Sequence, residues 1–202
     1  LEETLLLPET PQPGLYQVQT VLDLSEAGDR SALENALGFW GSDYQVPGEW
    51  VIREDDELRI SSDGVLTYEA AAAGGLDPRY DVTGSDGEAS LVQAAALACY
   101  LAQQAVGAWC GTAGSAAWLY LSSVEETEDG WRITLDYCLD GATVYLGDGW
   151  PAATFTVSGG QIASFEIRPR CYVASEGTSS GLPQRQAAAA LEALSPEDPR
   201  EL

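Results

Sequence analysis

The chain has 202 residues, with 32 acidic and nine basic side chains, no histidine and a formal net charge of −23 at pH 7. A surface this negative repels nucleic-acid phosphates and anionic lipids, and it leaves open a cationic partner, bound cations or solubility alone. All nine basic residues are arginine, which excludes Schiff-base lysines, serine–lysine dyads and the lysine of a phosphate-binding loop. The lack of histidine excludes histidine-based triads, imidazole zinc ligands and histidine proton relays.

We expect four segments: a stalk or linker at 1–14, a first α+β unit at 15–75, a second at 76–181, and a helix with a tail at 182–202. Prolines among polar residues hinder regular pairing in the first segment. The chain does not begin with methionine, and it has neither a signal-peptide core nor an unbroken run of about eighteen apolar residues. We therefore expect the processed portion of a longer protein, with no membrane-spanning segment of its own.

The first unit is predicted to begin with a strand and a helix. Even spacing of apolar residues indicates a strand within 16–24. Apolar residues at i, i+3, i+4 and i+7 indicate one buried helix face, formed by Leu33, Ala36, Leu37 and Trp40. Ser25 or Asp29 is placed to cap the first turn of this helix, and Gly41 is placed to end it.

The segment 38–50 is dense in aromatic residues and glycine. One interpretation is a partner-binding loop, with Trp40, Tyr44 and Trp50 as the binding aromatics, because rigid aromatic rings are favoured interface anchors. The other is structural, with the same rings fastening the helix to the next strand by burial.

The second unit is predicted to be a four-stranded meander covered by an alanine-rich helix at 89–106. Residues 131–139 alternate between apolar and polar side chains, the period of a strand with one buried face. Short turns separate this strand from extended runs at 118–124, 143–146, 155–157 and 162–173. Because the helix comes just before a sheet that needs a cover on its apolar face, we predict an α+β fold.

An internal repeat relates the two units. Leu58-x-Ile60-Ser61-x-x-x-Val65-x-Thr67-Tyr68-Glu69 matches Phe155-x-Val157-Ser158-x-x-x-Ile162-x-Ser164-Phe165-Glu166 without a gap. Each copy reads as a strand, a turn of small residues and a returning strand, and a predicted helix precedes each copy. The alternatives are two related helix-plus-antiparallel-sheet units or convergent hairpins. A further helix, predicted at 187–194, would open a third unit or form a lid on the second.

The nucleophilic side chains form no complete site in the sequence. Residues 177–181 fit G-x-S-x-G, but no base is available for Ser179, so we interpret the motif as a loop. No C-x-x-C motif occurs among the four cysteines, which are Cys99, Cys110, Cys138 and Cys171. Cys99 and Cys110 would lie about 16 Å apart on one continuous helix, too far for a disulfide unless glycines break it. We expect free thiols, with one disulfide as the alternative in an oxidising setting.

Three acidic clusters, at 54–57, 81–88 and 125–129, are candidates for calcium binding or for a catalytic carboxylate pair. None fits an EF-hand loop, and charge runs near turns are usually solvated. We therefore predict no catalytic, metal-binding or cofactor-binding residue.

One sequence pattern resembles a known family. Tyr137-x-x-Asp140-Gly141-x-x-Val144 ends an extended segment, and a strand, a small turn and a strand ending in Phe165 follow it. This pattern is similar to the extracytoplasmic domains of the YycH/YycI type, and it covers about 118–194. PepSY-type domains share a related layout.

The resemblance implies a non-enzymatic regulator held outside the membrane by an N-terminal anchor that precedes this chain. Its expected partner is a cell-wall sensor kinase of the membrane or a sister regulator, in Gram-positive bacteria. The alternatives are a PepSY-like module that restrains a protease and a carboxylate-dependent hydrolase acting on cell-wall glycans.

Overall fold

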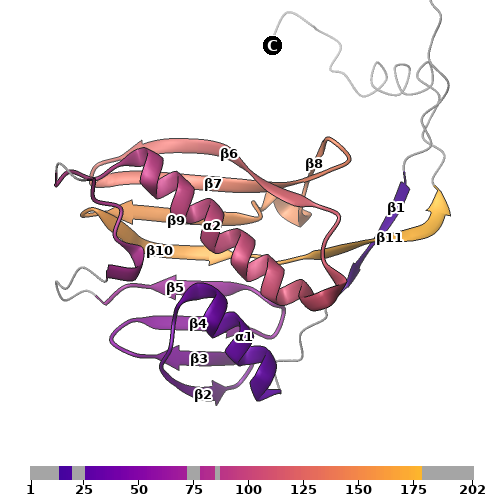
Figure 1. Cartoon of the computed structure of the whole chain (residues 1–202), viewed down its shortest axis with the longest axis horizontal. Coiled ribbons are helices and arrows are strands. Elements are labelled where there is room, and N and C mark those ends of the chain that lie inside the picture. Colours follow the sequence, from indigo (N-terminus) through magenta and orange to yellow (C-terminus); the bar gives the residue numbers. More distant parts are fainter. Residues whose placement is uncertain (1–13, 20–25, 72–77, 85–86, 179–202) are drawn as a thin grey trace, which may run out of the picture. The chain divides into compact units, whose positions relative to one another are not determined.

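The computed structural model describes residues 14–19, 26–71, 78–84 and 87–178, and Figure 1 labels their helices and strands. The chain divides into two units, one of residues 18–173 and one that combines 1–17 with 174–202. Strand β1 (Gly14–Gln19) pairs with β11 (Cys171–Thr178) in a separate two-stranded sheet. Residues 1–13 of the predicted stalk, residues 179–181 of the Ser179 motif and the predicted helix at 187–194 lie outside the described residues. Gly14 of the predicted stalk begins β1, and Gly177 and Thr178 of the predicted loop end β11.

The larger unit contains one nine-stranded antiparallel sheet, which confirms the predicted α+β class. Its strands are β2 (Ser42–Val46), β3 (Glu49–Arg53), β4 (Glu57–Ser61), β5 (Leu66–Glu69), β6 (Trp118–Thr127), β7 (Gly130–Leu139), β8 (Ala142–Val144), β9 (Ala153–Ser158) and β10 (Gln161–Ile167). The strand order is β2-β3-β4-β5-β10-β9-β7-β6, and β8 pairs with the end of β7. The predicted meander is therefore present as β6, β7, β9 and β10, and the two predicted units share one sheet through the β5–β10 pair.

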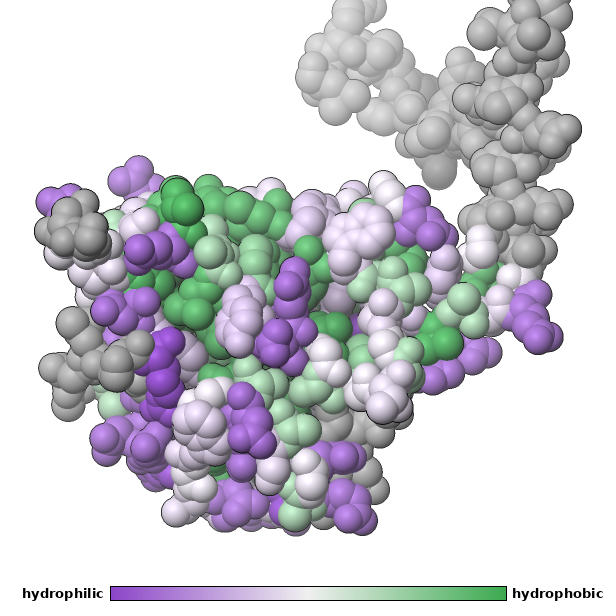
Figure 2. All heavy atoms as spheres, in the orientation of Figure 1, coloured by the Kyte–Doolittle hydropathy of each residue, from purple (hydrophilic) through white to green (hydrophobic). Residues whose placement is uncertain are grey.

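Two helices, α1 (Ala27–Leu37) and α2 (Leu91–Cys110), lie on the same face of this sheet (Figure 1). Short 3-10 turns occur at Pro78–Tyr80, Gly111–Ala113 and Gly147–Gly149. The strands bury every second side chain under the helices, as in the predicted alternation of β7, where Ile133, Leu135 and Tyr137 are buried. Figure 2 shows this helix-bearing face, on which hydrophobic side chains gather over β6 and the adjoining part of α2.

The internal repeat is arranged about a pseudo-twofold axis that passes through the sheet between β5 and β10. The repeat aligns Tyr68 with Phe165, and these two residues are direct cross-strand partners. Thr67 pairs with Glu166, and Ser164 pairs with Glu69. Since the repeat aligns Thr67 with Ser164 and Glu69 with Glu166, each of these pairs is the symmetry mate of the other. This register supports two related units over convergent hairpins.

An aromatic cluster crosses the axis and joins the two halves of the core. The rings of Tyr68 and Phe165 are stacked with centroids 5.0 Å apart, and Tyr80 meets Tyr68 edge-on at 4.8 Å. Phe39, at the end of α1, contacts the same tyrosine at 5.9 Å. All four side chains are at most 2% exposed, and aromatic pairs of this geometry contribute about 0.5–1.5 kcal/mol each beyond their burial.

The first helix differs from its prediction at both ends. It ends at Gly38, whose φ of 65° is a left-handed cap conformation, and not at Gly41. The chain then turns so that Phe39 enters the core in place of Trp40, which is 57% exposed. The N-cap residue is Glu26 and makes no side-chain cap, Asp29 lies within the first turn, and Ser25 is outside the described residues.

The second helix continues four residues past its predicted end, to Cys110. Gly107 does not interrupt it, so Cys99 and Cys110 lie on one continuous helix. By length and composition alone, Leu91–Ala113 is apolar enough to cross a membrane, whereas the sequence predicted no membrane-spanning segment. One side of this helix nevertheless belongs to the core, through Ala94, Ala98, Leu101, Ala102, Ala105, Val106, Trp109 and Cys110.

Two further segments differ from their predictions, the loop interpretation of 38–50 and the single strand at 162–173. The aromatic segment 38–50 contains the strand β2, which pairs with β3 across a turn where Gly48 has a φ of 83°. The run predicted as one strand at 162–173 is two strands, because residues 168–170, which include Pro169, separate β10 from β11. Proline lacks the amide that a ladder position must donate.

Candidate functional site

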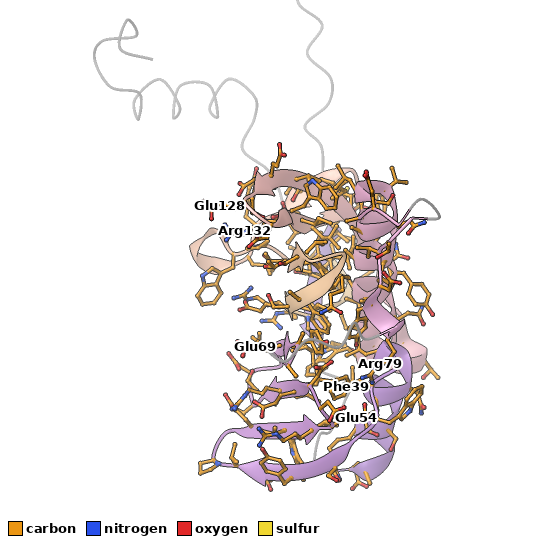
Figure 3. The ribbon with its side chains drawn as sticks, turned by 90° about the vertical axis from the view of Figure 1, so that its left-hand side faces the viewer. Phe39, Glu54, Glu69, Arg79, Glu128 and Arg132 are labelled. Atoms are coloured by element: carbon orange, nitrogen blue, oxygen red, sulfur yellow. The ribbon has the colours of Figure 1, made fainter. Side chains whose placement is uncertain are left out.

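The face of the sheet opposite the helices is polar where the two repeats meet. Alternation along the strands directs Thr67 and Glu69 of β5, Ser164 and Glu166 of β10, Thr154 and Thr156 of β9, and Arg132 of β7 to this helix-free face. Figure 3 shows Glu69 and Arg132 on the side of the sheet away from the helices, with Phe39 on the helix side. A polar floor of this kind is accessible to a ligand or to a partner protein.

A groove of about 470 Å³ runs over this floor. Trp150 and Pro151, which follow the 3-10 turn after β8, line it beside the strands. Its lining residues are Thr67, Tyr68, Glu69, Arg132, Trp150, Pro151, Thr154, Thr156, Ser164, Phe165, Glu166 and Arg168. We refer to it as the dyad groove, because the pseudo-twofold axis passes through its floor.

The pseudo-twofold axis brings the final glutamates of both repeat copies into the dyad groove. Because Ser164 is the direct partner of Glu69, Glu166 is a diagonal neighbour of Glu69 on the same face. Diagonal neighbours in an antiparallel pair are about 7–8 Å apart. The dyad groove therefore contains two carboxylates and two hydroxyls in symmetry-related positions.

Arg168 is the less exposed of the two arginines in the dyad groove. Its guanidinium lies over the ring of Trp150, 4.8 Å from the centroid, and forms an ion pair with Glu166. The Arg168 side chain is only 13% exposed, and its buried Nε atom has no hydrogen-bond partner within the described structure. An unpaired buried donor costs about 1–3 kcal/mol, so an acceptor supplied by water or by a bound group would stabilise this side chain.

Arg132 is the more exposed cation of the dyad groove. Its Nη1 lies 3.8 Å from Oε2 of Glu125, which is on the edge strand β6. The Arg132 side chain is 55% exposed and the Glu125 side chain is 64% exposed. Exposed pairs of this kind contribute about 0–1 kcal/mol. Arg132 can therefore exchange Glu125 for an incoming carboxylate at little cost.

The three aromatics predicted to bind a partner do not come together. Trp50 faces the helices, packs against the core and carries the Arg30 guanidinium 4.0 Å from its ring centroid. Tyr44 lies on the opposite face of the sheet and is 41% exposed. Trp40 follows α1, and its indole nitrogen donates to Asn35 Oδ1 at 3.1 Å. Trp50 thus has the structural role that the alternative interpretation gave it.

Most of the described residues of the acidic clusters are exposed, but Asp56 is buried. Asp56 is 7% exposed, accepts from the Tyr68 hydroxyl at 2.7 Å and accepts from the Ala71 amide at 2.6 Å. Glu54, in the same cluster, pairs with Arg79 at 3.0 Å. The expectation of a fully solvated turn is therefore wrong for Asp56, because its carboxylate accepts hydrogen bonds from the buried Tyr68 hydroxyl and from the Ala71 amide. Among the described residues, no group of three or more metal-ligating side chains is found.

All four cysteines are free thiols in the structure. Cys110 and Cys171 are buried next to each other. Burial is the larger cause and contact with Cys171 the smaller cause that together raise the pKa of the Cys110 thiol to about 12. Cys171 Sγ lies 2.9 Å from the carbonyl oxygen of Gly114. These thiols are on the helix-bearing side and are not part of the dyad groove.

Sequence reasoning found the repeat but missed the dyad groove. The signal available was the shared ending, Thr67-Tyr68-Glu69 in one copy and Ser164-Phe165-Glu166 in the other. What could not be read from either copy was that the two endings pair with each other. Arg168 and Trp150 lie outside the repeat match and carried no sequence signal.

Comparisons with protein-family models, curated proteins and solved structures found no match. The resemblance to YycH/YycI-type domains therefore stays a prediction.

Proposed function

We propose that this chain is a non-enzymatic regulatory protein that binds a partner protein through the helix-free face of its sheet, with the dyad groove at the centre of the contact. The observation that carries the proposal is the grouping of an exposed tryptophan and an exposed arginine around a polar hollow. Trp150 is 52% exposed and Arg132 is 55% exposed. Tryptophan and arginine are the residues most enriched among those that dominate binding energy.

The charge distribution favours a partner that has a basic surface overall and that places both acidic and basic groups in the dyad groove. The net charge of −23 attracts basic surfaces over long range. Within the dyad groove, by contrast, the two arginines balance the two glutamates. An approaching basic protein would be steered by the whole molecule and then held by hydrogen bonds, with a carboxylate of its own placed against Arg132.

The resemblance suggests which partner this is. We propose the extracytoplasmic part of a membrane sensor kinase or a sister regulator, with this chain held outside the membrane by an anchor that precedes it. A PepSY-like role, in which the partner is a restrained protease, uses the same surface. The two roles are distinguished by whether a sensor kinase or sister regulator, or instead a protease, is recovered together with this chain.

The test is affinity recovery from detergent-solubilised envelopes with the tagged chain and matched variants. Trp150→Ala and Arg132→Glu are expected to reduce the recovered membrane partner at least about tenfold, as interface hot spots do. Trp40→Ala is the control, because Trp40 has a similar exposure, 57% against 52%, but lies after α1. Recovery of cytosolic proteins only, or of a partner whose binding depends on Trp40 and not on Trp150, would show that the proposal is wrong.

Glu69 and Glu166 support one second candidate, a carboxylate-dependent hydrolase acting on cell-wall glycans. Glycosidases place two carboxyl groups about 5–10 Å apart across the scissile bond. Arg168 neutralises Glu166 by an ion pair but supplies no proton of the kind that a general acid donates, so we prefer the binding role. Release of soluble fragments from peptidoglycan, abolished by both Glu69→Gln and Glu166→Gln, would favour the hydrolase.

A further inference from the structure

Helix α2 is uncharged along its whole length, in a chain with 32 acidic residues. Leu91–Cys110 contains no Asp, Glu or Arg. Part of this helix nevertheless faces outward, and its exposed residues are Leu91, Val92, Gln93, Ala96, Tyr100, Gln103, Gln104 and Gly107. Exposed helix faces are usually charged, so this face has the composition of a contact surface.

Five of these residues form a regular seam. Gln93, Ala96, Tyr100, Gln103 and Gly107 follow one another at intervals of three and four. This is the spacing by which one helix presents a continuous stripe to another helix. Small residues in the stripe allow close approach, and Tyr100, which is 55% exposed, is its one large side chain. We call these five residues the α2 seam.

A hollow lies at the C-terminal end of the α2 seam. It has a volume of about 230 Å³ and is bounded by Gln103, Val106 and Gly107 on the helix and by Trp118 and Leu119 of β6. A Cβ atom added at Gly107 would meet nothing within 4 Å. Glycine inside a helix costs about 0.5–1 kcal/mol relative to alanine, and no contact within the described structure requires it here. The space above Gly107 is therefore available to a side chain from another molecule.

We propose that two copies of this chain pair antiparallel through the C-terminal half of the α2 seam, about a twofold axis between Gln103 and Gln104. Tyr100 and Gly107 are equally far from that axis, one on each side. The ring of Tyr100 in one copy then fills the hollow at Gly107 in the other copy, and the second copy does the same in return, as a closed twofold interface requires.

Shape is the reason to choose a second copy as the occupant, because each copy presents both the exposed Tyr100 ring and the hollow that would receive it. Two molecules that each carry −23 repel each other wherever their acidic surfaces meet. The α2 seam brings together two uncharged helices, and Leu121 and Val124 on the same side of β6, 43% and 36% exposed, extend the apolar area. The dyad groove is on the opposite face of the sheet, so the pairing does not depend on the proposed function.

The experiment is analytical ultracentrifugation of the full chain up to about 1 mM, at about 0.15 M and about 1 M NaCl, where the Debye lengths are about 8 Å and 3 Å. We expect a monomer–dimer equilibrium that tightens at high salt, because screening removes the repulsion between the two copies. Monomer under both conditions, or a dimer that weakens at high salt, would overturn the proposal.

Two variants test the contact itself. Tyr100→Ala and Gly107→Leu are expected to raise the dimer Kd at least about tenfold, the first by removing the ring and the second by filling the hollow. Leucine also favours helix more than glycine does, so the Gly107→Leu monomer should stay folded. Tyr145→Ala is the control, because Tyr145 is 86% exposed and lies outside the helix. An unchanged Kd in either variant, or an equal effect of the control, would contradict the proposal.

Discussion

The pairing of Asp56 with Tyr68 leads to a sharp prediction, because the second repeat copy lacks it. The Tyr68 hydroxyl donates to Asp56 Oδ2 at 2.7 Å, and both side chains are buried. In the second copy, Ala153 stands at the position of Asp56 and Phe165 at that of Tyr68. The two halves thus show the same site with both polar partners present and with both replaced by apolar residues.

Tyr68→Phe removes the hydroxyl and leaves the buried Asp56 carboxylate with the Ala71 amide as its other donor among the described residues. A hydrogen bond to a charged group contributes about 1.5–3 kcal/mol. We expect the free energy of unfolding to fall by about 2 kcal/mol and Tm by about 4–8 °C for a chain of this size. Asp56→Ala should cost a similar amount. The double variant, which copies the second repeat, should cost about 1 kcal/mol less than the sum of the two.

The assay is urea unfolding of the four proteins, followed by tryptophan fluorescence. The three variants should have the slope m of the wild type, so that the shifts report stability alone. A Tyr68→Phe variant within about 0.5 kcal/mol of the wild type, or single effects that add without coupling, would refute the reasoning.

Three further predictions concern single positions. Gly130→Ala should lower the free energy of unfolding by about 1–3 kcal/mol, because Gly130 has a φ of 154° and an added Cβ would lie 2.3 Å from the Val157 carbonyl oxygen. Chemical unfolding measures this change, and Gly107→Ala is an unstrained control. Ser90→Ala should cost about 1 kcal/mol, because the Ser90 hydroxyl accepts from the Gln93 amide at the start of α2; hydrogen exchange of the first turn should show the fraying, and unchanged protection would count against the cap. Burial raises the pKa of the Cys110 thiol from its usual 9.0 to about 12. Between about pH 9 and 12 the folded chain therefore keeps a proton that the unfolded chain loses, and the free energy of unfolding should fall as pH rises. Urea unfolding at a series of pH values measures this fall, and Cys110→Ala should reduce it.

Much of the fold followed from periodicity, and the errors came from contacts that a local pattern does not contain. The β7 alternation, the turn at Asp140-Gly141 and the alanine-rich helix depend on neighbouring residues, and all three are present in the structure. Trp40 was placed on the face of α1 because its spacing fits a helix. The left-handed conformation of Gly38 ended that helix first and put Phe39 in the core.

The candidate site was harder to predict than the fold. The two repeat endings were visible in the sequence, but the pairing of β5 with β10 is a long-range contact, and only that contact makes neighbours of Glu69 and Glu166. Arg168 was missed for a different reason. It follows β10 in a segment that was predicted as strand, whereas the break at Pro169 lets its guanidinium lie over Trp150.

Photo-crosslinking in living cells, with the reactive group placed at Thr156 in the dyad groove or at Trp40 after α1, tests the proposed binding surface most directly. We expect the Thr156 position to yield one adduct with a membrane-associated protein, lost with Trp150→Ala, and the Trp40 position to yield none. The same adduct from both positions, or an adduct from Trp40 alone, would contradict the assignment of the dyad groove as the partner-binding surface.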